Sequence, residues 1–242
     1  MDMRTNYDMT YVYDGTLEGL YTCVFRCYED KYIPCAVVTQ NTLTPCAPVF
    51  TDKVKAARVK RGVFNKMGTL AADMIYKAFL SDFEDKELAV IRFIVYGMKA
   101  GHTASGDLAH PDVARMYEIY RAVNREARMT AERLVFSLTG GLMVAIVEPS
   151  HNVLPLIVKH FTQRYPNDEI FIYDKVHKLG ATWSHARVTF NRIEHFEPDP
   201  ADEEEETYRR LWQIFYDAVE IKERHNPRLR DMNMPIRHRR KF

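Results

Sequence analysis

Residues Leu142 to Tyr173 constrain the fold more than any other stretch of the sequence. The run from Leu142 to Val147 is apolar without interruption and has the length of a strand buried on both faces. From Val153 to Arg164, apolar residues recur at helical spacing, and Ile170 to Tyr173 is again apolar. This order predicts strand, helix and strand, an arrangement that suits a right-handed crossover within one sheet.

The helix of this unit has recognisable ends. Ser150 or Asn152 is a suitable cap for its start, and Pro155 falls near the first turn, where a missing N–H costs little. His160 and Arg164 lie on the same helix. We expect His160 to be partly buried among apolar neighbours, yet these two residues are the ones that packing explains least.

The rest of the chain predicts an α+β fold with a mixed or antiparallel sheet. Apolar residues repeat at helical spacing over about residues 51–128, so the middle of the chain is expected to be helical. The sheet is expected over about residues 133–196. Two hairpins form part of it, the first joining 134–136 to 142–147 and the second joining 170–173 to 181–185.

Both ends of the chain have signals of their own. A short strand at Tyr11 to Tyr13 is followed by a helix that Asp14 or Thr16 caps. Near the other end, the acidic run from Asp202 to Glu206 marks the first turn of a C-terminal helix. We therefore expect a single α+β domain over residues 1–226 and a basic C-terminal tail over residues 227–242.

Composition excludes several classes of protein. Apolar residues make up 46% of the chain, which suits a large core, but no apolar run reaches the roughly 18 residues of a membrane helix. The N-terminus has no apolar signal core. These features predict a cytoplasmic protein without a membrane partner.

The cysteines and histidines do not predict a metal site. Cys23, Cys27, Cys35 and Cys46 contain no pair at zinc-knuckle spacing, and small buried thiols are the expected alternative. The sequence also has no phosphate-binding glycine loop, nucleophile elbow or zinc-protease motif. We accordingly expect neither a metal nor a cofactor.

Three polar residues remain as catalytic candidates. Asp14 lies at a strand-to-helix turn, His160 on the central helix, and Asp174 at a strand end beside His177 and Lys178. An enzyme acting on a nucleotide or nucleic acid would need the three candidates to converge in one cleft as acid and base groups.

The C-terminal end is the most basic part of the chain. Residues 222–242 hold eight Lys or Arg and two acidic residues, and clustered cations of this kind can neutralise the phosphates of DNA or RNA. The predicted phosphate contacts are Arg224, Arg228, Arg230, Arg237, Arg239 and Arg240, with Arg164 at the edge of the core.

Three stretches resemble one bacterial family. They are YVYDGTLEGL at 11–20, NVLPLIVKHFTQR at 152–164 and ERHNPRLRDMNMPIR at 223–237. The order and spacing resemble the bacterial DNA metabolism protein family, whose core is a domain of unknown function. By motif position, the resemblance draws attention to Asp14, His160, Arg164, Asp174, Asn226, Arg228, Pro235 and Arg237.

The resemblance implies a role in DNA repair or modification. Members of that family are typically encoded beside a radical-SAM protein, and some carry a uracil-DNA-glycosylase-like domain. Here the chain ends soon after the third motif, so glycosylase activity is not expected. We expect an accessory protein that binds nucleic acid, a radical-SAM partner or both. A nucleic-acid-processing enzyme and a non-catalytic scaffold for the partner are the alternatives.

Overall fold

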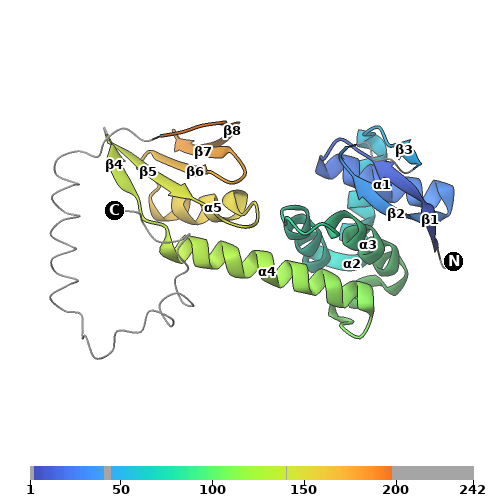
Figure 1. Ribbon diagram of the computed structural model, residues 1–242. Helices are drawn as coiled ribbons and strands as arrows, with labels where there is room; N and C mark the ends of the chain where they lie inside the picture. The colour runs from blue at the N-terminus through green and yellow to red at the C-terminus, as the bar shows by residue number, and fades with distance from the viewer. Residues whose placement is uncertain (1–2, 41–44, 140, 198–242) are drawn as a thin grey trace, which may run out of the picture. The chain divides into compact units, whose positions relative to one another are not determined.

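The computed structural model describes residues 3–40, 45–139 and 141–197 (Figure 1). The chain divides after Asn124 into two compact units. Helices and strands are both well represented, which confirms the α+β class. The C-terminal helix and the basic tail that the sequence predicts lie outside the described residues.

The first unit contains a small parallel sheet. Its order is β2-β1-β3, with β1 (Arg4–Val12) between β2 (Tyr32–Val38) and β3 (Cys46–Pro48). Helix α1 (Leu17–Asp30) connects β1 to β2. The sequence predicts a strand only at Tyr11–Tyr13, because most of the earlier residues of β1, RTNYDMT, are polar.

Helices make up the rest of the first unit, as the sequence predicts for the middle of the chain. They are α2 (Lys53–Phe79), α3 (Lys86–Ala100), the short 3-10 helix η1 (Gly101–Gly106) and the start of α4 (Pro111–Arg133). Asp52 caps α2, since its side chain accepts hydrogen bonds from the N–H groups of Val54 and Lys55. The hydrophobic core of this unit contains fully buried residues such as Leu20, Met74 and Phe93.

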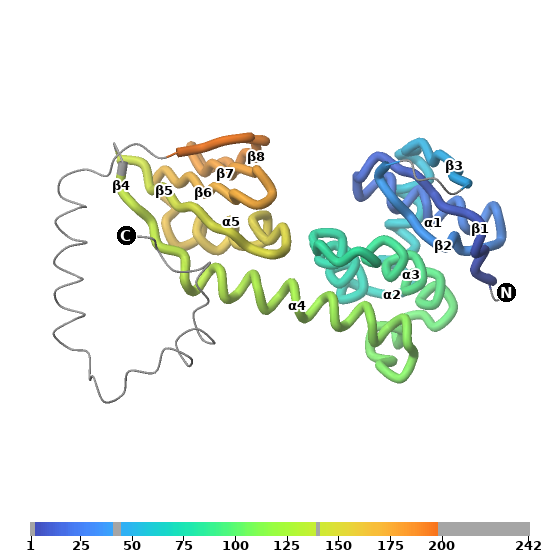
Figure 2. Tube along the Cα trace, in the orientation of Figure 1, coloured from blue at the N-terminus to red at the C-terminus, as the bar shows by residue number. Residues whose placement is uncertain are grey.

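The second unit contains a mixed sheet, which is one of the two forms that the sequence predicts. Its order is β4-β5-β6-β7-β8 (Figure 2). Strands β5 and β6 are parallel, while the other neighbours are antiparallel. The strands are β4 (Ser137–Thr139), β5 (Leu142–Val147), β6 (Ile170–Asp174), β7 (Leu179–Ser184) and β8 (Arg187–Arg192). Helix α5 (Leu154–Arg164) connects β5 to β6, which confirms the strand–helix–strand unit.

Two local predictions in this unit are wrong. Helix α5 begins at Leu154, and neither Ser150 nor Asn152 caps it. The loop before the helix is bonded to α4 instead, since the N–H of Ser150 donates to Glu126 Oε1 at 2.7 Å. The first hairpin strand is 137–139 instead of 134–136. Phe136 packs edge-to-face on Phe161 of α5, with ring centres 5.1 Å apart, so this apolar stretch covers the helix and does not pair in the sheet.

Within the described part of the chain, no helix is both long enough and apolar enough to cross a membrane.

Candidate nucleic-acid interface

Asp14 organises the turn from β1 into α1. Its Oδ1 accepts hydrogen bonds from the N–H and the hydroxyl of Thr16, and its Oδ2 accepts one from the Thr51 hydroxyl at 2.7 Å. Thr16 then caps α1 by accepting from the Gly19 N–H at 2.9 Å. Partial burial raises the pKa of Asp14, but the hydrogen bonds from Thr51 and Thr16 outweigh it and hold the pKa below its usual value.

The glycine at position 19 allows the Asp14 carboxylate to lie against the first turn of α1. A Cβ atom at Gly19 would be 2.2 Å from Asp14 Oδ1 and 2.9 Å from Thr51 Oγ1. No side chain larger than hydrogen fits there without moving the carboxylate. Asp14 is therefore built into the turn as an acceptor of three hydrogen bonds, which is a structural role.

Asp174 is also engaged by its own turn. Its side chain is fully buried at the end of β6, and Oδ1 accepts from the N–H groups of Val176 and His177 at 3.0 Å each. The other oxygen, Oδ2, lies 2.6 Å from Nδ1 of His177. This carboxylate holds the connection between β6 and β7 and has no open approach for a substrate.

His160 and Arg164 lie on the exposed side of α5, so the expectation that His160 is partly buried is wrong. The His160 ring contacts the ring of its neighbour Phe161 edge-to-face, and the Arg164 guanidinium lies over Tyr165 at 5.5 Å from the ring centre. Within residues 141–197, no hydrogen bond or ion pair joins His160 to Asp174. Asp14 belongs to the first unit, whereas His160 and Asp174 belong to the second.

The remaining predicted contacts lie beyond the residues that the structure describes. These are the six arginines of the C-terminal end, Arg224, Arg228, Arg230, Arg237, Arg239 and Arg240. The motif positions Asn226 and Pro235, to which the family resemblance draws attention, also lie there. They stay predictions.

Cys23 and Cys27 are fully buried on α1, as expected for structural thiols. Burial, reinforced by the nearby carboxylate of Asp14, raises the pKa of Cys23 to about 12, so the thiol is protonated at neutral pH. Cys35 is partly buried, and its thiol donates to the Met9 carbonyl at 3.2 Å. Among the described residues, no three His, Cys, Asp or Glu side chains form a group that could hold a metal ion.

The first half of α2 is a basic surface that the sequence reasoning missed. Between residues 53 and 67 there is no acidic residue, whereas six cations occur, namely Lys53, Lys55, Arg58, Lys60, Arg61 and Lys66. The positive end of a helix dipole favours carboxylates in the first turn, yet this turn holds Lys53 and Lys55. Helix stability therefore does not explain the charge.

Most of these cations are available for a ligand. Lys55 is engaged, because its ammonium lies 2.8 Å from Glu29 and 5.0 Å from the centre of the Phe25 ring. Lys60, Arg61 and Lys66 are exposed, and no described carboxylate forms an ion pair with any of the three. The charge in the middle of the helix thus faces solvent without compensation from the described residues.

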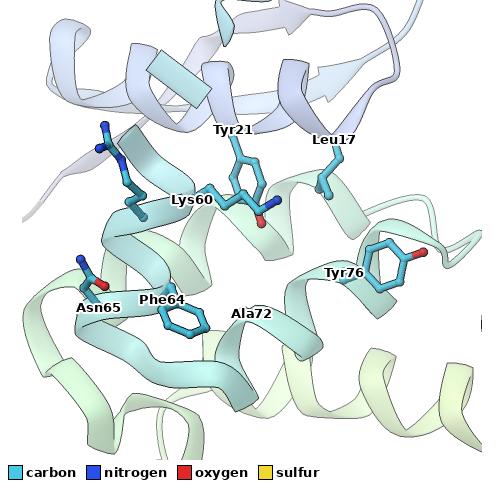
Figure 3. A pocket seen from close by; sticks show the side chains of 8 residues that line it. Leu17, Tyr21, Lys60, Phe64, Asn65, Ala72 and Tyr76 are labelled. Carbon is cyan, nitrogen blue, oxygen red and sulfur yellow. The ribbon is translucent and has the colours of Figure 1, made fainter. Parts of the chain in front are cut away.

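An apolar groove lies beside these cations. Its volume is about 370 Å³, and α1 lines one side of it while the two halves of α2 line the other (Figure 3). The lining residues are Leu17 and Tyr21 from α1 and Lys60, Arg61, Phe64, Asn65, Ala72 and Tyr76 from α2. Phe64 is 56% exposed, although its ring is entirely apolar. The groove therefore offers an exposed aromatic ring next to two cations.

The groove exists because α2 is kinked. Gly68 has φ 88° and ψ 179°, far from helical values, and it separates the half that carries Phe64 from the half that carries Ala72 and Tyr76. The acid-free run of cations from residue 53 to 66 is visible in the sequence and would have indicated the basic surface. The kink and the packing of α1 beside it are not visible there.

The comparison with protein families covers about two thirds of the chain. A family model described as a domain of unknown function, DUF4130, matches residues 84–242. The chain belongs to the DUF4130 family. The DUF4130 match starts just before α3 and includes the whole mixed sheet, whereas the groove between α1 and α2 precedes it. This match confirms one part of the family resemblance, namely that the chain contains a domain of unknown function.

Other comparisons add little to the DUF4130 assignment. No curated protein matches the sequence. One solved structure, a pGpG-specific phosphodiesterase from Vibrio cholerae, aligns with 89% of this chain and 100% of its own at 9% identity and a TM-score of 0.32. A likeness of this size carries no weight for either fold or function.

Proposed function

We propose that this protein binds nucleic acid and serves as an accessory protein in bacterial DNA metabolism. The observation that carries the proposal is the acid-free, basic first half of α2, whose cations Lys60, Arg61 and Lys66 have no ion-pair partner among the described residues. Proteins bind nucleic acid chiefly by neutralising phosphates with Lys and Arg, which releases condensed counterions. Exposed cations that have no ion-pair partner among the described residues suit that task.

Binding is better supported than catalysis. Two of the three catalytic candidates, Asp14 and Asp174, each accept hydrogen bonds within their own turns, and the third, His160, is an exposed residue on α5. None of them needs a substrate to explain its position. The link to DNA metabolism and to a radical-SAM partner rests on the family resemblance of the three sequence motifs.

The salt dependence of binding tests this proposal. We expect the affinity of the intact protein for duplex DNA to fall steeply with salt. In the double variant Lys60→Gln and Arg61→Gln, the slope of log K against log salt should become shallower by about 0.9 for each phosphate that the variant no longer neutralises. Fluorescence anisotropy with a labelled duplex, measured over a range of salt concentrations, gives both slopes.

A matched control removes the same charge elsewhere. Lys159 on α5 and Arg187 on β8 are exposed and have no ion-pair partner among the described residues, so the variant Lys159→Gln and Arg187→Gln should keep the wild-type slope. Failure of the wild type to bind at low salt would overturn the proposal. If both double variants had the same salt slope, the assignment of the phosphate contacts to α2 would be wrong. Nuclease treatment before a pull-down separates a direct protein partner from one that DNA bridges.

A further inference from the structure

We propose that the groove between α1 and α2 holds an unpaired base, so that the protein prefers single-stranded nucleic acid. The base stacks on the ring of Phe64 and the adjoining phosphates lie against Lys60 and Arg61. This inference rests on the proposed nucleic-acid binding and specifies the form of the ligand.

The exposed ring is the first reason. Phe64 is 56% exposed on a helix whose buried stripe is made by Val59, Val63 and Met67. Folding would be served better by a polar residue at this position, because an exposed apolar ring forgoes the free energy gained on burial. A ring in this position can stack with a base, which is the usual way in which proteins hold single strands.

The shape of the site is the second reason. The lining is apolar along Leu17, Tyr21, Ala72 and Tyr76, and Figure 3 shows Tyr21 and Leu17 of α1 across from Phe64. A hollow of about 370 Å³ is within the range of small-ligand sites, so a flat aromatic ring can enter it. The bases of a duplex are stacked on one another and cannot reach such a site without being unpaired.

The charge around the hollow is the third reason, and it decides between a base and an apolar protein segment. Lys60 and Arg61 line the groove itself, and Lys60 precedes Phe64 by four residues, which places the two side chains on one face of the helix. Two carboxylates of these helices are engaged in ion pairs: Glu29 pairs with Lys55 at 2.8 Å, and Asp73 pairs with Lys77 at 2.8 Å. Glu18 is exposed, and its negative charge lies close to Tyr21. Burial raises the pKa of the Tyr21 phenol to about 12, with a smaller contribution from the Glu18 carboxylate.

Two cations, Lys60 and Arg61, line the groove against the exposed carboxylate of Glu18. The balance of charge is positive, and the polyanionic backbone of a single strand is complementary to it. Aromatic stacking supplies sequence-tolerant affinity, while the cations follow the phosphates. A neutral, apolar helix from another protein would gain nothing from Lys60 and Arg61.

The test compares a labelled single-stranded oligonucleotide with its own duplex, using the full chain. We expect the wild type to bind the single strand more tightly. Phe64→Leu keeps an apolar side chain and every charge, so it should weaken binding of the single strand at least about fivefold and leave duplex binding and the salt slope unchanged. Phe190→Leu, the same change at a 45% exposed phenylalanine on β8, should leave both affinities unchanged.

The outcomes separate the two proposals. If the wild type binds neither the single strand nor the duplex, the proposed function and this inference are both wrong. A groove that binds a protein segment instead of a base would give this outcome. If the wild type binds duplex as tightly as single strand, or if Phe64→Leu binds single strand like the wild type, the base-stacking inference is wrong while nucleic-acid binding stands. Urea denaturation of Phe64→Leu confirms that the variant remains folded.

Discussion

Single residues in this chain show why an unusual polar position need not be a catalytic one. Asp14 is exposed and lies at the carboxyl end of a parallel strand, where active-site residues often occur. Its carboxylate nevertheless accepts three hydrogen bonds from Thr16 and Thr51, and the glycine at position 19 leaves space for it. These hydrogen bonds account for the residue fully.

The hydrogen bonds to Asp14 predict how stability depends on pH. Because the pKa of Asp14 is lowered in the folded state, its contribution is present above the unfolded pKa of about 3.9 and is lost as pH falls through the folded pKa. We expect Asp14→Asn to lower the free energy of unfolding by about 1 kcal/mol at pH 7, and the difference from wild type to vanish in acid. Urea denaturation at several pH values measures both.

Asp8→Asn is the control for this change. Asp8 is exposed on β1, and its carboxylate accepts no hydrogen bond from the described residues, so its replacement should alter stability little at any pH. A difference between wild type and Asp14→Asn that persists unchanged at the lowest pH would contradict the assigned role.

Among the elements, α2 supplies most of the residues that line the groove in the first unit. Its first half supplies the cations and Phe64, its second half supplies Ala72 and Tyr76, and the interruption at Gly68 separates them. Gly68 has φ 88° and ψ 179°, a conformation that other residues adopt only with strain. The kink is thus encoded by one residue.

Gly68→Ala tests this dependence. The added Cβ would lie 3.4 Å from His102 Nδ1, an ordinary contact, so the cost comes from the backbone conformation. We expect a decrease of about 1–3 kcal/mol in the free energy of unfolding, measured by urea denaturation. Gly106→Ala is the control, because no atom lies within 4 Å of its added Cβ. Equal stability of the two variants would show that the kink does not depend on glycine.

Elements whose signals are local could be predicted from the sequence. The Asp14 and Thr16 turn and the Asp52 cap follow from capping residues, and the β5–α5–β6 unit follows from short-range periodicity. The β2-β1-β3 sheet could not, because β1 is largely polar, β3 has only three residues, and the strands pair across long separations in the sequence. The groove also depends on non-local packing, since it needs α1 placed beside a kink in α2.

At the scale of the whole molecule, two basic segments are separated by most of the chain. One is the first half of α2, and the other is the C-terminal end, where residues 222–242 hold eight Lys or Arg. A protein that neutralises more phosphates binds more tightly and depends more steeply on salt. If both segments contact one DNA molecule, their contributions to the salt slope must add.

A second set of substitutions tests this addition in the full chain. We expect Arg237→Gln, Arg239→Gln and Arg240→Gln together to weaken duplex binding and to flatten the salt slope by about 0.9 for each phosphate left without its cation. Combined with Lys60→Gln and Arg61→Gln, the two reductions should sum, because each set acts on different phosphates. Anisotropy titrations over a range of salt concentrations measure the slopes, with Lys159→Gln and Arg187→Gln as the control. If the arginine substitutions leave DNA binding unchanged but abolish retention of a protein partner after nuclease treatment, the C-terminal segment contacts protein and α2 alone contacts nucleic acid.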